Sequence, residues 1–248
     1  MSLAGRNAVV TGGASGIGRS ICLRLARDGA DVAILDLDAA GGEQVAGAVR
    51  ALGRRALAVE ADVSSATSVE GALARVRREL GAVHILVNDA GIAEFVPVVH
   101  MTEAQWDRMI AVHLKGTFLC TRAALPDMIA AGWGRIVNVS SVGGLRGGPA
   151  LAHYAAAKAG MIGFTKAVAI EVGPQGITVN AIAPGLIDTP LLRKSQVPDA
   201  IFEHARRETP VRRIGAPDDI AAACAYLVSE EASFFTGRVM SPNGGGHL

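Results

Sequence analysis

The chain has 248 residues, and 50% of them are apolar, so it can bury a sizeable core. Lysine and arginine number 24 against 23 aspartates and glutamates, and this net charge of +1 argues against nucleic acid or a membrane surface as a partner. The three cysteines stand far apart, without the spacing of a metal site or a disulfide framework, so we expect no metal. The N-terminus has no apolar run long enough for a signal peptide or a membrane span, and we expect a cytoplasmic protein.

The first predicted elements form a strand, a glycine-rich turn and a helix. A short apolar strand at 7–11 runs into glycines, and an amphipathic helix continues to about residue 28. Glycines let the backbone approach a pyrophosphate closely, and a helix N-terminus offers free N–H groups and a positive dipole end. The spacing G-x-x-x-G-x-G is by itself equally compatible with tight packing alone.

A carboxylate follows the second predicted strand, Asp31 to Leu35. Asp36 stands 18 residues beyond Gly18, where it can accept hydrogen bonds from the ribose hydroxyls of an adenosine and would repel a 2′-phosphate. Neither Ser15 nor Leu37 supplies a cation for such a phosphate, so we expect NAD in preference to NADP. The alternative is that Asp36 only caps the next helix.

Strands and helices continue to alternate, which predicts a doubly wound parallel α/β sheet of about seven strands with helices on both faces, in three layers. The expected helices are at 40–52, 65–80, 102–131 (which Pro126 could kink) and 217–228, together with one that carries Tyr154 and runs to about 172. The expected strands are at 56–60, 84–87, 135–139, 177–182 and 238–241.

Ligands of such sheets bind beyond the carboxyl ends of the strands, so we expect Asp62, Asn88 and Gly91 at the same edge as Gly12 and Asp36. Leu186 to Ile214 follows such a strand end and holds three prolines and six basic residues. We interpret it as a substrate lid, with a solvated surface excursion as the alternative. No repeat or linker marks a second domain, so we expect one domain over residues 1–248.

Tyr154 and Lys158 stand four residues apart in an Ala-rich helical segment and therefore share a helix face. A positive charge about 4 Å away would stabilise the phenolate by roughly 4 kcal/mol at an effective dielectric constant of 20, which is about three pK units. That shift would bring the phenol into the range of general acid–base catalysis. For this spacing alone, a surface Tyr and a solvated Lys are the more frequent explanation.

Together these residues resemble the short-chain dehydrogenase/reductase family over nearly the whole chain. The matching elements are TGGASGIG at 11–18, Asp62, NDAG at 88–91, Ser141 thirteen residues before Tyr154, YxxxK at 154–158, and Pro184-Gly185 with Thr189.

The resemblance implies a Rossmann-type catalytic domain, a homotetramer, and hydride transfer between NAD and a secondary alcohol or ketone. Tyr154 would be the general acid or base, Lys158 would lower its pKa and hold the nicotinamide ribose, and Ser141 would hold the substrate oxygen. The implied cofactor residues are Gly12, Ser15, Gly16, Ile17, Gly18, Asp36, Leu37, Asp62, Val63, Asn88, Ala90, Gly91, Tyr154, Lys158, Pro184, Gly185, Ile187 and Thr189. The candidate substrate residues are Ser141, Tyr154, Glu94, Phe95, Val142, Gly143, Leu151 and Leu186.

Two positions depart from the family pattern. His113 stands where the family usually has a catalytic Asn, and since it can still donate or accept a hydrogen bond we count it as catalytic. A histidine bonded to a neighbouring carbonyl for structural reasons is the alternative. Asp89 replaces the usual second Asn of NNAG, a residue that is mainly structural in the family.

The function expected is that of an NAD-dependent alcohol dehydrogenase or ketone reductase. A 3-oxoacyl-thioester reductase, acting on an acyl carrier protein or CoA substrate, is the alternative. The carrier-protein version generally resembles an NADPH enzyme, and Asp36 argues against it. A non-catalytic cofactor-binding regulator is the remote alternative, and intact Ser141, Tyr154 and Lys158 argue against that.

Overall fold

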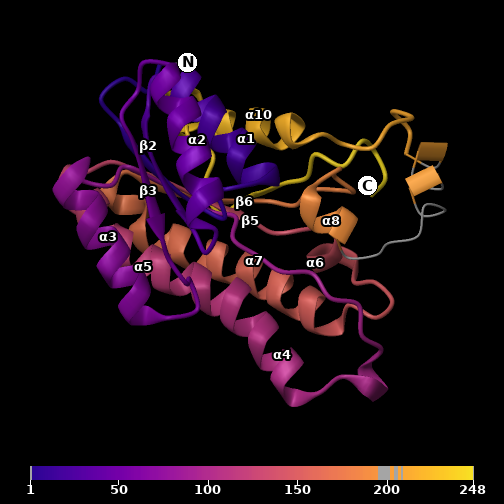
Figure 1. The fold of residues 1–248 in the computed structure, drawn as a ribbon. Coiled ribbons are helices and arrows are strands. Elements are labelled where there is room, and N and C mark those ends of the chain that lie inside the picture. Colours follow the sequence, from indigo (N-terminus) through magenta and orange to yellow (C-terminus); the bar gives the residue numbers. More distant parts are fainter. Residues whose placement is uncertain (1, 195–201, 204–205, 208, 248) are drawn as a thin grey trace.

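The computed structural model describes residues 2–194, 202–203, 206–207 and 209–247. In these residues a seven-stranded parallel sheet has the strand order β3-β2-β1-β4-β5-β6-β7 (Figure 1). The strands are β1 (Asn7–Thr11), β2 (Asp31–Asp36), β3 (Ala56–Glu60), β4 (Ile85–Asn88), β5 (Gly134–Val139), β6 (Ile177–Ile182) and β7 (Val239–Met240). The predicted doubly wound fold is confirmed.

Helices cover both faces of the sheet, because successive strand side chains point to opposite sides. Val10 of β1 and Ile34 of β2 belong to one buried cluster, whereas Val9 and Leu35 belong to the other. The first cluster is covered by α1 (Gly16–Arg27), α2 (Ala39–Ala51) and α10 (Pro217–Leu227), and the second by α3 (Ala66–Glu79), α5 (Gly116–Ala131) and α7 (Ala152–Val172) (Figure 1). The result is the expected three-layer arrangement.

The register brings the polar strand ends together. Thr11 of β1 lies opposite Asn88 of β4, and Asn88 lies opposite Asn138 of β5. Because all the strands are parallel, the loops that follow β1, β2, β4 and β5 leave the sheet at one edge. This edge carries most of the residues that the sequence singles out.

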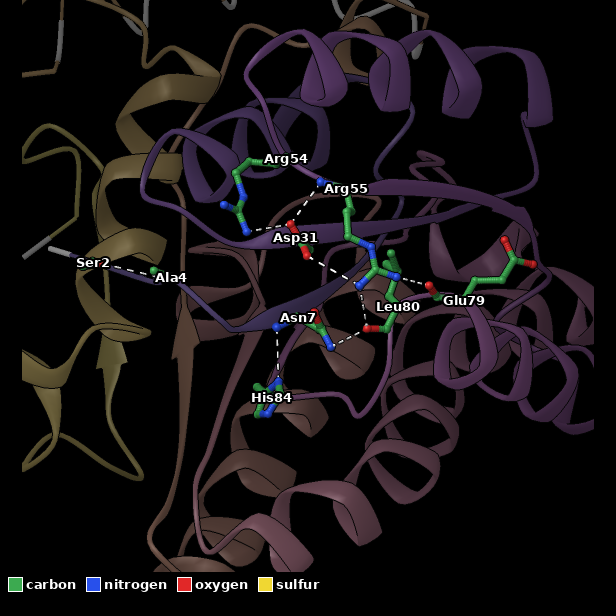
Figure 2. Close-up of polar contacts among 9 residues, drawn as sticks. All are labelled: Ser2, Ala4, Asn7, Asp31, Arg54, Arg55, Glu79, Leu80 and His84. Carbon is green, nitrogen blue, oxygen red and sulfur yellow. Dashed lines mark hydrogen bonds and ion pairs between the residues drawn. The ribbon is translucent and has the colours of Figure 1, made fainter.

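The opposite edge is held by a polar network around Asp31, at the start of β2 (Figure 2). Its Oδ1 accepts hydrogen bonds from Arg54 Nη2 at 2.7 Å and from the backbone N–H of Arg55 at 3.0 Å. Asn7 of β1 donates from Nδ2 to the Leu80 carbonyl oxygen at 3.0 Å. These contacts tie the amino ends of β1 and β2 to the loops that precede β3 and β4.

The long helical segment predicted at 102–131 is interrupted once. Thr102 caps α4 (Glu103–Ile110) in a capping box with Gln105, whose N–H it accepts at 3.2 Å. A π-helical turn, Ala111–Lys115, then joins α4 to α5, and α5 continues across Pro126. The irregular turn therefore lies at the segment that carries His113. Such turns are frequent at functional sites.

Two C-terminal predictions need correction or restriction. β7 is shorter than the predicted strand at 238–241, because only Val239 and Met240 pair with β6. The predicted lid contains a short helix, α8 (Pro190–Lys194), but residues 195–201, 204–205 and 208 lie outside the described part of the chain. Its role as a lid, and the assignment of residues 1–248 to one domain, stay predictions. Among the described residues, no helix combines the length and apolar character needed to cross a membrane.

Candidate active site

The glycine turn after β1 is packed directly against the loop that follows β4. A Cβ atom added at Gly12, whose φ is +69°, would lie 2.8 Å from the Ala90 Cα. A Cβ at Gly18 would overlap the Gly12 carbonyl oxygen. The first turn of α1 therefore lies against two backbone segments. The Ser15 side chain makes no cap hydrogen bond to α1, which leaves the N-terminal end of this helix open to a ligand.

Asp36 is tied to the glycine turn and does not cap α2. Its Oδ2 accepts the Ala14 N–H at 3.0 Å, and its Oδ1 accepts the Asp38 N–H at 3.0 Å. Asp38 is the residue that caps α2, since it accepts the Gly41 N–H at 2.9 Å. The capping alternative for Asp36 is thus wrong, and its carboxylate is placed beside the predicted adenosine site.

A cleft of about 450 Å³ opens along this edge of the sheet. Such a volume is ordinary for a small-molecule site. The predicted cofactor residues that line it are Gly12, Ser15, Gly16, Ile17, Asp36, Leu37, Asp62, Val63, Ala90, Gly91 and Thr189. The narrow glycine turn, the open end of α1 and the Asp36 carboxylate fit a dinucleotide.

The cleft is also lined by Asp89 of the predicted 88–91 segment and by Pro190, Leu191 and Lys194 of the predicted lid. The lining residues that were not predicted are Leu35, Ala61, Ser64, Ile92, Arg108 and Val112. Arg108 belongs to α4 and Val112 to the π-helical turn that carries His113, and no pattern in the sequence points to either of them. Strand-end position could have pointed to Ala61 and Ser64 beside Asp62.

Seven predicted cofactor residues do not line the cleft. Two of them are Tyr154 and Lys158, and the other five are held by the fold. Gly18 lies beneath the turn, and Asn88, with 4% of its surface exposed, donates from Nδ2 to Asn138 Oδ1 at 2.8 Å. The Pro184 carbonyl oxygen accepts the Val142 N–H, and the Gly185 N–H donates to the Pro242 carbonyl oxygen. The side chain of Ile187 is buried in the core. Their cofactor roles stay predictions.

Tyr154 and Lys158 share a helix face as predicted, but the ammonium does not bond to the phenol. Lys158, 4% exposed, donates from Nζ to the Val139 carbonyl oxygen at 2.7 Å, and its Nζ lies 5.7 Å from the centroid of the Tyr154 ring. The Ser141 Oγ accepts the Gly143 N–H at 2.9 Å and also lies within hydrogen-bond reach of Tyr154. The three predicted catalytic side chains are therefore together.

The pKa of Tyr154 is raised above its ordinary value in this structure. Burial is the main cause, the hydrogen bond with Ser141 lowers the pKa, and the charge of Asp89 raises it. Burial also lowers the pKa of Lys158 to about 8, and Asp89 opposes that shift. The expected lowering of the Tyr154 pKa by Lys158 is thus wrong for the protein without ligand, since the spacing says nothing about burial.

His113 lies in the π-helical turn and is 2% exposed. Its Nε2 lies 2.9 Å from the Ile92 carbonyl oxygen and 3.1 Å from the Ile92 nitrogen, and its ring meets Tyr154 edge-on at 5.5 Å. Nδ1 has no hydrogen-bond partner among the described residues. Burial, helped by the charge of Lys158, holds its pKa well below the usual value, so the ring is neutral. His113 thus makes the expected carbonyl contact and also touches Tyr154.

The candidate substrate residues are dispersed along the rim. Glu94 accepts a hydrogen bond from Gln105, and Phe95 is 45% exposed. The Ala150 carbonyl accepts the Val96 N–H at 2.8 Å, which ties the segment around Glu94 and Phe95 to the loop before Leu151. Val142 and Gly143 begin α6 (Gly143–Arg146) beside Ser141. Leu186 lines a separate cavity of about 150 Å³ between the lid segment and the C-terminal tail. Its substrate role remains a prediction that this placement does not support.

The chain was also compared with known proteins. A profile of the family described as "Enoyl-(Acyl carrier protein) reductase" matches residues 12–247. The chain is 40% identical to the 3-oxoacyl-[acyl-carrier-protein] reductase FabG of Pseudomonas aeruginosa over 100% of both chains. It is 41% identical to the acetoacetyl-CoA reductase of Cupriavidus necator over 98% of both. The crystal structure of levodione reductase superposes with a TM-score of 0.94 at 35% identity, covering 98% of this chain and 97% of that one. The chain therefore belongs to the short-chain dehydrogenase/reductase family and is an oxidoreductase of alcohol and ketone groups.

Proposed function

We propose that the protein interconverts a secondary alcohol and a ketone with NAD(H) rather than NADP(H). The position of Asp36 carries this proposal. Asp36 lines the cleft together with Leu37, and a 2′-phosphate placed beside its carboxylate would meet that negative charge. The lining includes the cations Arg108 and Lys194, which belong to α4 and α8 rather than to the strand end that carries Asp36.

The catalytic roles follow from the grouping of Ser141, Tyr154 and Lys158. When bound, the nicotinamide supplies or accepts the hydride. Ser141 holds the carbonyl oxygen, and Tyr154, kept protonated by its raised pKa, donates a proton to that oxygen during reduction. Lys158 is fixed on the Val139 carbonyl, from which its charge acts on the anion that develops beside Tyr154.

A 3-oxoacyl-thioester reductase is the second candidate. The named activities of two relatives, on a 3-oxoacyl carrier protein and on acetoacetyl-CoA, support it. The same Ser141, Tyr154 and Lys158 would serve either substrate, so the two candidates differ in what the rim accepts.

We also propose a homotetramer in the cytoplasm. The outer sides of α4, α5 and α7 expose Trp106, Phe118 and Ile170, on the face of the sheet that these helices cover (Figure 1). A second copy of the chain would bury this apolar surface. Light scattering should give four times the mass of one chain, and Phe118→Glu should lower it. A monomeric wild type would contradict this part of the proposal.

The three free, buried cysteines support a reducing compartment.

The test is NADH oxidation against β-ketoacyl thioesters, aryl, cyclic and anionic ketones and keto-sugars, with NADPH run beside it. Asp36→Ala should cut the preference for NADH, measured as a ratio of kcat/KM values, by about tenfold or more, which is about 1.4 kcal/mol. Asp38→Ala removes an exposed neighbouring carboxylate and should leave the ratio unchanged.

The outcomes separate the candidates. Preference for NADPH in the wild type would overturn the assignment of Asp36, and turnover of thioesters alone would favour the second candidate. Tyr154→Phe should abolish turnover and spare NADH binding. NADH binding without turnover of any ketone by the wild type would favour a cofactor-binding regulator.

A further inference from the structure

Asp89 places a carboxyl group where the cofactor cleft meets the first turn of α1. It follows β4, its N–H donates to Thr11 Oγ1 at 3.1 Å, and the residue lines the cleft. Oδ2 lies 2.9 Å from the point where a Cβ of Gly18 would be, so the carboxyl group lies against the backbone of the first turn of α1. Asp89 thus brings a carboxyl group to the first turn of a helix whose N-cap residue, Ser15, makes no side-chain cap hydrogen bond.

This position creates an electrostatic conflict with the proposed cofactor. A carboxylate at a helix N-terminus is stabilised by the helix dipole, and so is a bound phosphate. The pyrophosphate of a dinucleotide would lie against the same first turn, where Gly16 and Ile17 face the cleft. Two anionic groups would then share one helix end, and a neutral side chain at position 89 would remove the repulsion.

The charged and titratable groups that act on Asp89 come from every element around it. Its pKa is raised to about 7, mainly by burial, while Lys158 of α7 and the Gly18 N–H lower it and Asp36 of β2 raises it. The groups on the other helices that feel its charge are Tyr154 of α7, Cys22 of α1 and Cys224 of α10, and the pKa of each is raised. Tyr154 and both thiols therefore stay protonated at neutral pH, which leaves Asp89 and Lys158 as the pair that changes charge there.

We propose that Asp89 couples dinucleotide binding to the uptake of a proton, so that the cofactor binds the protein with Asp89 neutral. The inference rests on the proposed function. The sign follows from the charges: a bound pyrophosphate raises the pKa of Asp89 further, so the complex holds a proton that the free protein loses above about pH 7. Below this pH the affinity is constant. Above it the dissociation constant rises by up to about tenfold per pH unit until Asp89 also ionises in the complex.

Lys158 would produce a pH dependence of the same sign, because an anionic ligand also raises its pKa. The comparison is therefore made in the Lys158→Met background as well as in the wild type. Asp89→Asn keeps the shape of the side chain and an oxygen for the Gly18 N–H while removing the charge. Asp62→Asn is the matched control, since Asp62 is a second carboxylate that lines the cleft.

The experiment is calorimetric binding of ADP-ribose, which carries the pyrophosphate without the nicotinamide, from about pH 6 to about pH 9. In the wild type the dissociation constant should rise by about tenfold or more over this range, and Asp89→Asn should reduce the rise. With Lys158→Met the rise should begin at a higher pH, because the charge of Lys158 no longer lowers the pKa of Asp89, and adding Asp89→Asn should abolish it. Asp62→Asn should change the dissociation constant by the same factor at each pH.

An equal pH dependence with and without Asp89 would overturn the inference and leave the proposed function intact. Absence of binding of both ADP-ribose and NADH by the wild type at every pH would overturn the proposed function, and this inference with it. If Asp89→Asn fails to fold, titrations of Lys158→Met in two buffers of different ionisation enthalpy report the protons directly. Because the charge of Lys158 no longer lowers the pKa of Asp89 in this variant, the uptake should appear toward the upper end of the pH range. Uptake approaching one proton there supports the inference, and none at any pH of the range overturns it.

Discussion

The phenol of Tyr154 should titrate above its ordinary pKa of about 10 in the protein without ligand. Lys158 Nζ lies 5.7 Å from the ring centroid. A full charge at that distance would stabilise the phenolate by about 3 kcal/mol at an effective dielectric constant of 20, or about two pK units. Burial brings the pKa of Lys158 to about 8, however, so most of this charge is gone before the phenol begins to ionise. Burial of the phenol and the charge of Asp89 then decide the direction of the shift.

The chain is well suited to this measurement because it contains only two tyrosines. Tyr226→Phe keeps the ring that meets Phe235 edge-on at 6.3 Å and leaves Tyr154 as the single phenol. A pH titration of the phenolate absorbance in this background then reports Tyr154 alone.

In that background, Lys158→Met should move the midpoint by less than about half a pH unit, since the lysine is already neutral. Ser141→Ala should raise the midpoint, because the hydrogen bond from Ser141 lowers the pKa of Tyr154. A midpoint below about pH 9, or a rise of about two units on Lys158→Met, would show that Lys158 stays charged and would refute this reasoning.

Three further substitutions test the packing around the site by thermal and denaturant unfolding. Gly91→Ala would place a Cβ against the buried ring of His113, 3.1 Å from Nδ1, and should lower the free energy of unfolding by about 1–3 kcal/mol. An unchanged melting temperature would contradict this expectation. Gly71→Ala is the control that should not destabilise the protein, because the space around its Cβ is open. Ala150 has a φ of 57°, so Ala150→Gly should raise the free energy of unfolding by about 1 kcal/mol, and a loss would show that the turn is not strained. Asp31→Ala removes the acceptor of Arg54 Nη2 and of the Arg55 N–H and should cost about 2 kcal/mol of the free energy of unfolding. A cost below about 0.5 kcal/mol would mean that the Asp31 contacts in Figure 2 contribute little to stability.

The positions at strand ends could be predicted because the topology is simple. In a parallel sheet every βα loop leaves at the same edge, so Gly12, Asp36, Asp62 and Gly91 had to meet once the strands were identified. The lining residues that the sequence did not predict include Arg108, which lies outside the loops that follow the strands. Arg108 arrives through the rotation of α4 about its axis, which depends on how α4 packs rather than on its own pattern of apolar residues.

The π-helical turn at His113 had no signal in the sequence. One additional residue in a helical turn leaves the local composition unchanged, and its effect appears only in which side chains share a face on either side of it. The sequence also could not predict which of Asp36 and Asp38 caps α2. Both carboxylates lie near the start of α2, and only the coordinates decide that Asp38 accepts the Gly41 N–H.

The spacing of Tyr154 and Lys158 predicts a shared helix face but not the direction of the ammonium. Lys158 bonds to the carbonyl at the end of β5 and is buried, so its charge is fixed in place and costly to maintain. An anionic ligand in the cleft would raise the pKa of Lys158 again and restore that charge. We therefore expect Lys158 to stabilise a phenolate at Tyr154 only when the cleft is occupied. Neutralisation of Asp89 in the same complex would remove the charge that raises the Tyr154 pKa, so both changes favour proton transfer in the complex over the free protein.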